Sequence, residues 1–178
     1  KYADLGQFNA KGLASTDLQD AKASIDKAVV HEKTSGDASA WVYKALIYAD
    51  VAFVALLDSV VAKTEPLITE AANALKKGVE LDKIGANKVN IDRAGVLISR
   101  YELNRGVSAY KSSQYDDAYV AFNKALIYKQ GDTTLTYYSG LAAVNAKNYQ
   151  AAIQTYEQLI KTNFSSNRQI YLDLSRMY

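Results

Sequence analysis

The sequence predicts an all-α chain, and three observations support this fold class. Proline occurs once and glycine nine times in 178 residues, while residues that favour helices are abundant. The chain has no runs of alternating β-branched residues, the pattern that predicts strands. The amphipathic stretch QYDDAYVAFNKAL at 114–126 returns as NYQAAIQTYEQLI at 148–160. A helix repeated at a fixed interval indicates an array of stacked units.

The two stretches match at an interval of 34 residues, and the match extends upstream of both. The paired positions are Gly106 and Gly140, Ala109 and Ala143, Tyr115 and Tyr149, Ala118 and Ala152, Phe122 and Tyr156, and Leu126 and Ile160. Each repeat therefore contains two helices, a helix A with the glycine and a helix B with the aromatic stripe. We expect Gly106 and Ala118 where A and B cross, because larger side chains would hold the helices apart.

A period of 34 with small residues at these points resembles the tetratricopeptide repeat (TPR) family. The resemblance implies a right-handed solenoid of helical hairpins, with about four helix pairs and an extra C-terminal helix. The expected helix pairs are a divergent first pair at 1–30, a second pair at 38–82 with an inserted loop at 53–65, a third pair at 89–130 and a fourth pair at 132–163. The start of a fifth helix A is expected at 167–178.

The first two pairs are assigned by their fit to this pattern. LQDAKASIDKAV at 18–29 is expected to be the first helix B, so its helix A must lie in 2–14. In the second pair, Trp41 followed by Ala45 matches the family's Trp and Gly sites. In ITEAANALKKGVELD, the second helix B, Ala71 stands in the place of Ala118 and Leu75 in that of Phe122.

Turn residues mark several helix boundaries. Gly131 and Asp132 combine a glycine stop with an N-cap for the next helix. Pro66 belongs in the first turn of a helix, where its missing N–H costs nothing. Ser113 and Asn148 stand where the short turns from helix A to helix B end.

Composition excludes several function classes. Lys and Arg number 21 against 19 Asp and Glu, a net charge of +2 without a basic stripe, so no nucleic-acid partner is expected. The chain has no cysteine, which excludes disulfides and thiolate metal sites. The single histidine, His31, follows a predicted helix B, where the helix dipole favours a cation. With no phosphate-binding glycine loop and no HExxH, we expect no cofactor, no metal and no catalytic residues.

The acidic pair Asp116 and Asp117 is expected to be structural. Neighbours on a helix diverge by about 100° and cannot share a proton efficiently, and acidic residues favour a first turn. No uncharged apolar run reaches membrane-spanning length, because the longest candidate contains Asp50 and Asp58. We therefore expect no direct membrane insertion.

The fourteen tyrosines suggest a binding surface. Some fill core positions of helix B, but others fall on helix A faces that in this family line the inner groove. Tyrosine offers a large contact area with a polar tip, which suits binding anchors. The candidate groove residues are Tyr43, Arg100, Asn104, Tyr110, Tyr137, Tyr138, Leu141 and Arg168. The alternative is that these rings pack between neighbouring repeats.

One known mode of binding in this family does not fit. Some members hold a peptide's C-terminal carboxylate with Lys and Asn side chains on successive A helices. The corresponding positions here hold Leu103, Val107, Tyr137 and Leu141, and only Asn104 is polar as required. A carboxylate clamp is therefore not expected.

The resemblance implies a non-enzymatic scaffold that binds a protein or peptide on the concave face of its stacked helices. The alternative is a structural spacer or oligomerisation module of a larger envelope-associated protein, and an enzyme ranks third. The long insertions and aromatic-rich A helices resemble exported bacterial TPR proteins. We therefore expect a periplasmic or otherwise exported protein, with the cytoplasm as the alternative.

Overall fold

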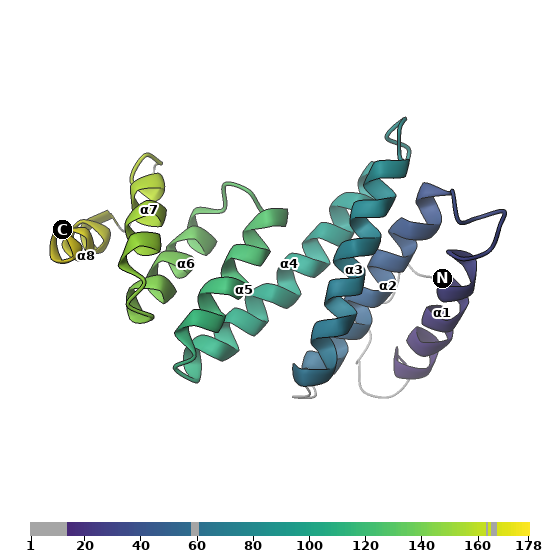
Figure 1. The fold of residues 1–178 in the computed structure, drawn as a ribbon, viewed down its shortest axis with the longest axis horizontal. Coiled ribbons are helices and arrows are strands. Elements are labelled where there is room, and N and C mark those ends of the chain that lie inside the picture. Colours follow the sequence, from purple (N-terminus) through teal and green to yellow (C-terminus); the bar gives the residue numbers. More distant parts are fainter. Residues whose placement is uncertain (1–13, 58–60, 163, 165–166) are drawn as a thin grey trace. The chain divides into compact units, whose positions relative to one another are not determined.

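The structure is a computed structural model that describes residues 14–57, 61–162, 164 and 167–178 (Figure 1). Within these ranges the regular elements are all α-helices, which confirms the all-α fold class. The helices are α1 (Ala14–Ala28), α2 (Ala38–Leu57), α3 (Val61–Leu81), α4 (Lys88–Lys111), α5 (Tyr115–Tyr128), α6 (Thr133–Asn145), α7 (Tyr149–Leu159) and α8 (Asn167–Met177). The first helix A, predicted within 2–14, lies outside the described residues except for Ala14.

The chain divides into two compact units. The first ends at Tyr101 and the second runs from Glu102 to Tyr178, so α4 contributes its N-terminal part to one unit and its C-terminal part to the other.

In the first unit, α2 packs against α1 on one side and α3 on the other. The helices α2 and α3 pack tightly at Gly78, where an added Cβ would lie 2.6 Å from the Val42 Cγ2 atom. Ala45, Ala71 and Leu75, the residues that defined this pair in the sequence, are all buried. These positions support the predicted register.

The inserted loop predicted at 53–65 is wrong for most of its length. Residues 53–57 extend α2 and residues 61–65 begin α3, so the insertion lengthens both helices. The physical reason is apolar packing between α1 and α2: Val54 and Leu67 pack against the cluster of Leu18, Ile47 and Val51. The earlier start of α3 also moves Pro66 out of the predicted first turn and into the helix.

Helix α2 is long and apolar enough, by length and composition alone, to cross a membrane. In this structure it is a core helix, because 56% of its Ala38–Leu56 window is buried inside the protein. The Lys44 side chain of α2 is also buried, and its Nζ atom lies 2.7 Å from the Glu70 carboxylate on α3. Packing on both sides therefore accounts for the apolar character of α2.

In the second unit, the glycines of helix A lie against the aromatic rings of helix B. A Cβ added at Gly106 would lie 2.6 Å from the ring of Phe122, and one added at Gly140 would overlap the ring of Tyr156. Ala118 and Ala152 are fully buried at the corresponding places of α5 and α7. Small residues thus allow each pair to close around one aromatic ring.

The turns from helix A to helix B repeat the same backbone geometry. Ser113 has φ 60° and Lys147 has φ 59°, and these residues are 34 positions apart. In both turns the backbone amide of the next residue donates a hydrogen bond of 2.9 Å to the carbonyl five positions earlier. The two bonds run from Gln114 to Ala109 and from Asn148 to Ala143. This left-handed C-terminal cap is usually glycine, so both turns carry a small strain.

Helix α8 covers the end of the fourth pair. Ile170 and Leu174 are buried with Tyr156 and Leu159 of α7, and Met177 packs against this cluster. A terminal repeat without such a cover would expose an apolar face. The helix predicted at 167–178 is therefore present and acts as a cap on α7.

Candidate functional site

The predicted groove residues are divided between the two units. Tyr43 and Arg100 belong to the first unit, where Tyr43 is exposed on α2 and Arg100 lies 4.2 Å from the centre of the Phe53 ring. The others lie in the second unit: Asn104 and Tyr110 on α4, Tyr137, Tyr138 and Leu141 on α6, and Arg168 on α8.

Tyr110 is held in place by a contact between two A helices. The Asn145 Nδ2 atom, at the end of α6, donates to the Tyr110 hydroxyl at 2.9 Å and to the Leu141 carbonyl at 2.8 Å. The Tyr110 ring also meets that of Tyr115 edge to face, with centroids 5.2 Å apart. Burial, followed by the nearby phenols of Tyr115 and Tyr137, raises the pKa of Tyr110. The ring is therefore neutral and oriented before any ligand arrives.

Tyr137 and Tyr138 are neighbours in sequence with different environments. Tyr137 stacks on Tyr156 at 6.3 Å between centroids and lies 5.4 Å from Phe164. It belongs to the apolar cluster between α6, α7 and α8. Tyr138 is 42% exposed and its ring lies 6.0 Å from that of Phe122. Packing thus occupies Tyr137, while Tyr138 keeps much of its surface free.

The remaining predicted residues of this unit are Leu141, Asn104 and Arg168. Leu141 is partly buried on α6, and its carbonyl shares the Asn145 amide with Tyr110. Asn104 and Arg168 are exposed on α4 and α8. The structure brings Tyr110 together with Leu141, through Asn145, and Tyr137 together with Tyr138, whose rings are 6.0 Å apart.

Two residues of this surface, Asn145 and Tyr115, are not among the groove residues that the sequence predicts. Tyr115 was assigned to the core, yet it is only partly buried and its hydroxyl donates to the Ser113 Oγ atom at 3.4 Å. Asn145 ends helix A one position after Val144, the counterpart of Tyr110. The sequence signal for this contact is a polar residue at the end of helix A, next to the position that matches Tyr110 of the previous repeat.

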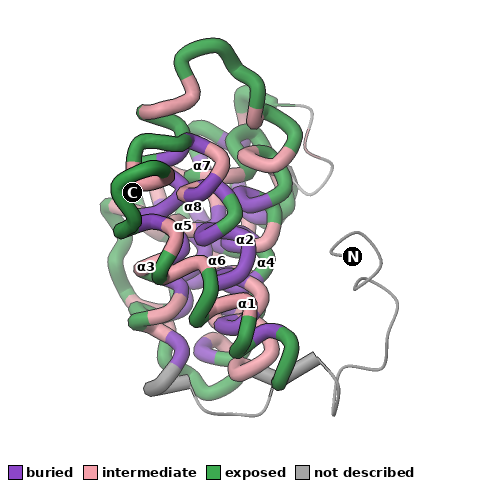
Figure 2. Tube along the Cα trace, turned by 90° about the vertical axis from the view of Figure 1, so that its right-hand side faces the viewer, coloured by how far each residue is buried: buried purple, intermediate pink, exposed green. Residues whose placement is uncertain are grey.

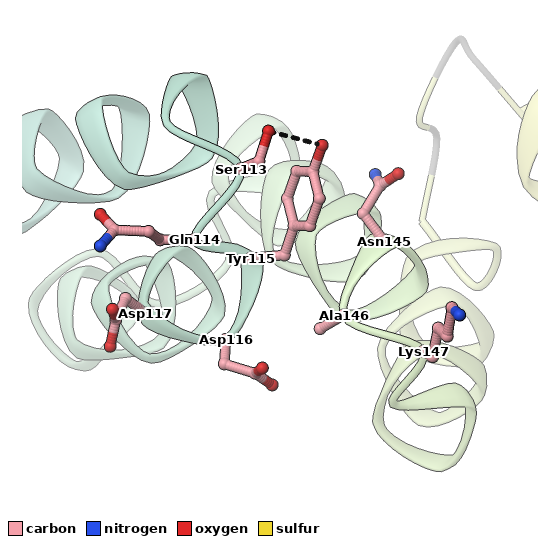
Figure 3. Close-up of a pocket in the computed structure, with 8 residues that line it drawn as sticks. All are labelled: Ser113, Gln114, Tyr115, Asp116, Asp117, Asn145, Ala146 and Lys147. Atoms are coloured by element: carbon pink, nitrogen blue, oxygen red, sulfur yellow. Dashed lines mark hydrogen bonds between the residues drawn. The ribbon is translucent and has the colours of Figure 1, made fainter.

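A hollow of about 370 Å³ lies beside this contact, where two A-to-B turns meet (Figure 3). Its lining consists of Ser113, Gln114, Tyr115, Asp116, Asp117, Asn145, Ala146 and Lys147. Figure 3 shows the carboxylates of Asp116 and Asp117 pointing in different directions. The described residues contain no group of three or more His, Cys, Asp or Glu that could hold a metal ion.

The first unit contains a charged cluster that the sequence argument did not predict. The Tyr48 hydroxyl donates to the Asp26 carboxylate at 2.7 Å, and Lys22 and Lys44 lie 3.0 and 3.5 Å from that carboxylate. Burial pushes the pKa of Asp26 upward, but the hydrogen bonds from Tyr48 and Lys22 outweigh it and the pKa lies below its usual value. The cluster thus ties α1 to α2 through a charged Asp26.

The comparison with family models supports the interpretation of the repeats. Residues 103–168, from the end of α4 to the start of α8, match the model described as Tetratricopeptide repeat. Comparisons with curated proteins and with solved structures returned no match. The family match supports a tetratricopeptide repeat protein. Such repeats generally mediate protein–protein interactions as scaffolds and are typically non-catalytic.

Proposed function

We propose that this chain is a non-enzymatic scaffold that binds a protein or peptide on the A-helix face of its second unit. The observation that carries the proposal is the hydrogen bond from Asn145 to the Tyr110 hydroxyl at 2.9 Å, which joins two successive A helices. A surface ordered before binding loses less entropy when a ligand arrives. Tyr110, Tyr138 and Leu141 form the proposed centre.

The chemistry of this face favours an apolar or aromatic ligand segment with free backbone polar groups. Leu103, Val107 and Val144 are partly buried and add aliphatic surface beside the tyrosines. The tyrosine hydroxyls and the Asn145 amide can hydrogen-bond a peptide backbone. Because the chain's net charge is only +2, we expect affinity to come from aromatic burial more than from electrostatic steering. A central tyrosine then contributes about 2 kcal/mol.

The proposal is tested by placing a photo-crosslinking phenylalanine derivative at Leu141 or at Val120, which is exposed on α5. In extract of the source cells, we expect a specific adduct from position 141 and none from position 120. Tyr138→Ala should abolish the adduct and leave the melting temperature within a few degrees. Adducts of equal yield from both positions, or a Tyr138→Ala variant that still crosslinks normally, would remove the basis for this face.

Tyr137 is a poor probe of binding, because its ring stacks on Tyr156. Its truncation is expected to lower stability whether or not the face binds a ligand. Loss of binding in a Tyr137→Ala variant would therefore be uninformative. Tyr138 and Leu141 separate binding from folding more cleanly.

An oligomerisation module is the second candidate. Tyr171, Leu172 and Tyr178 leave exposed apolar surface on and after α8. Leu172→Asp would dissociate an assembly formed through this end, and light scattering during size-exclusion chromatography would detect the change in mass. A wild-type chain that is monomeric at all concentrations would exclude this role for α8.

We also propose export to the bacterial periplasm, on the resemblance drawn from the long insertions and aromatic-rich A helices. Fractionation of the source cells tests this proposal. Recovery in the periplasmic fraction is expected, and recovery with cytoplasmic markers would contradict it.

A further inference from the structure

The turn between α3 and α4 presents apolar side chains to solvent at the end of a helical hairpin in the first unit (Figure 1). Ile84 is 90% exposed and Val89 80% exposed, and Val79 near the end of α3 is half exposed. The same turn is the exposed loop at the top of Figure 2. A single exposed apolar residue needs no explanation, but several gathered around one turn indicate an interaction surface.

This turn has a defined shape. The Asp82 carboxylate accepts hydrogen bonds from the Asn87 backbone N at 2.9 Å and from its Nδ2 atom at 3.3 Å. The Lys88 amide donates to the Gly85 carbonyl at 3.3 Å, and Gly85 adopts φ 70°, a conformation that favours glycine. Ile84 is thus exposed on a hydrogen-bonded turn.

Lysines outnumber acidic residues in the segment around this turn. The exposed lysines are Lys76, Lys77, Lys83 and Lys88. The only acidic residues between 76 and 89 are Glu80 and Asp82, and the Asp82 carboxylate is engaged within the turn. This segment has a net charge of +2, equal to that of the whole chain, so the remaining residues sum to zero.

We propose that the α3–α4 turn docks on an anionic lipid bilayer, with Ile84 and Val89 entering the headgroup region and Lys83 and Lys88 meeting lipid phosphates. Exposed apolar residues with exposed lysines beside them in the sequence suit the apolar and anionic chemistry of a membrane interface. A nucleic acid supplies phosphates but no apolar layer for Ile84. An acidic protein would need a concave apolar pocket to receive this turn. The contact is peripheral and inserts no helix.

Vesicle flotation with the full chain tests this docking. We expect binding to vesicles of phosphatidylcholine with phosphatidylserine, none to phosphatidylcholine alone, and weaker binding as salt rises. Each lysine near an anionic surface contributes roughly fivefold in affinity, so Lys83→Gln with Lys88→Gln should weaken binding about 25-fold. Ile84→Asp should weaken it at least about tenfold, because it removes an apolar contact and adds a negative charge.

Matched controls come from the second unit. Ile127 is 63% exposed on α5, and Lys161 is exposed after α7. Ile127→Asp and Lys161→Gln should bind vesicles as the wild type does. Equal losses in these controls would show that charge alone governs binding and would overturn the assignment to this turn.

The absence of cysteine allows a direct readout of depth. Ile84→Cys and Ile127→Cys are each labelled with an environment-sensitive fluorophore. A blue shift on anionic vesicles is expected at position 84 only. Absence of vesicle binding by the wild type, or an unshifted label at position 84 on bound protein, would overturn the proposal. In the first case an acidic protein surface would become the partner to test.

Discussion

The two units of this chain close their helix pairs with different side chains. In the second unit, glycine on helix A faces an aromatic ring on helix B, as in Gly140 and Tyr156. In the first unit the corresponding positions hold Ala45 and Leu75, and the tight contact lies instead between Gly78 and Val42. The comparison indicates that the crossing requires a suitable combined volume, which different residue pairs can supply.

The largest effect is expected from adding a methyl group under the ring in the second unit. Gly140→Ala would place its Cβ inside the contact distance of the buried Tyr156 ring. Overpacking of this kind should lower the free energy of unfolding by about 3 kcal/mol, measured by urea denaturation followed by circular dichroism. Gly36→Ala is the matched control, because an added Cβ there meets no atom within 4 Å.

A second substitution sharpens the comparison. Combining Gly140→Ala with Tyr156→Leu transfers the alanine and leucine pair of the first unit into the second. If combined volume is the requirement, this double variant should recover part of the stability lost by Gly140→Ala. A double variant less stable than either single variant would show that the two crossings follow different rules.

The next effect concerns the start of helix B in two repeats. The Asn148 side chain accepts a hydrogen bond from the Ala151 amide at 3.3 Å, whereas the corresponding Gln114 makes no such bond. Asn148→Ala should therefore lower the free energy of unfolding by about 1 kcal/mol, and Gln114→Asn should raise it by a similar amount. Urea midpoints that do not move would show that neither cap contributes.

A smaller effect, of opposite sign to most core substitutions, is expected at Tyr156. Its hydroxyl is buried and has no hydrogen-bond partner among the described residues, and burial raises its pKa far above the usual value. The matching position of the previous repeat holds Phe122. Tyr156→Phe should stabilise the chain by up to about 1 kcal/mol, seen as a higher urea midpoint. A lower midpoint would reveal a partner for the hydroxyl.

The smallest effect tests the charged cluster of the first unit. The pKa of the Asp26 carboxyl is lowered from its usual 3.8 in the folded chain. The charged carboxylate therefore stabilises the fold above pH 3.8, and this stabilisation is lost as the pH falls through the lowered pKa. Asp26→Asn should cost less than about 1 kcal/mol at neutral pH, since the group is partly exposed, and should reduce the loss of stability on acidification. Asp17→Asn, at an exposed site on α1, is the control. Identical acid profiles of Asp26→Asn and the wild type would show that the cluster does not stabilise the fold.

The repeat interval was sufficient to predict the fold class and much of the second unit. Gly106 and Gly140 lie under rings, Asp132 caps α6 through the Leu135 amide, and Ile170 and Leu174 cover α7. These features are readable because each depends on neighbours within one repeat or the next. Local spacing and residue size therefore carry the information.

The tertiary structure alone decided the features that depend on contacts distant in sequence. Val54 and Leu67 pack against a cluster that joins Leu18 of α1 to Ile47 and Val51 of α2, and most of the predicted loop at 53–65 is helix. Tyr137 and Tyr138 differ because stacking on Tyr156 occupies one ring and leaves the other partly exposed. A sequence pattern indicates which residues can face a helix neighbour. How long a helix continues and how much of a ring stays exposed depend on the surfaces that meet in three dimensions.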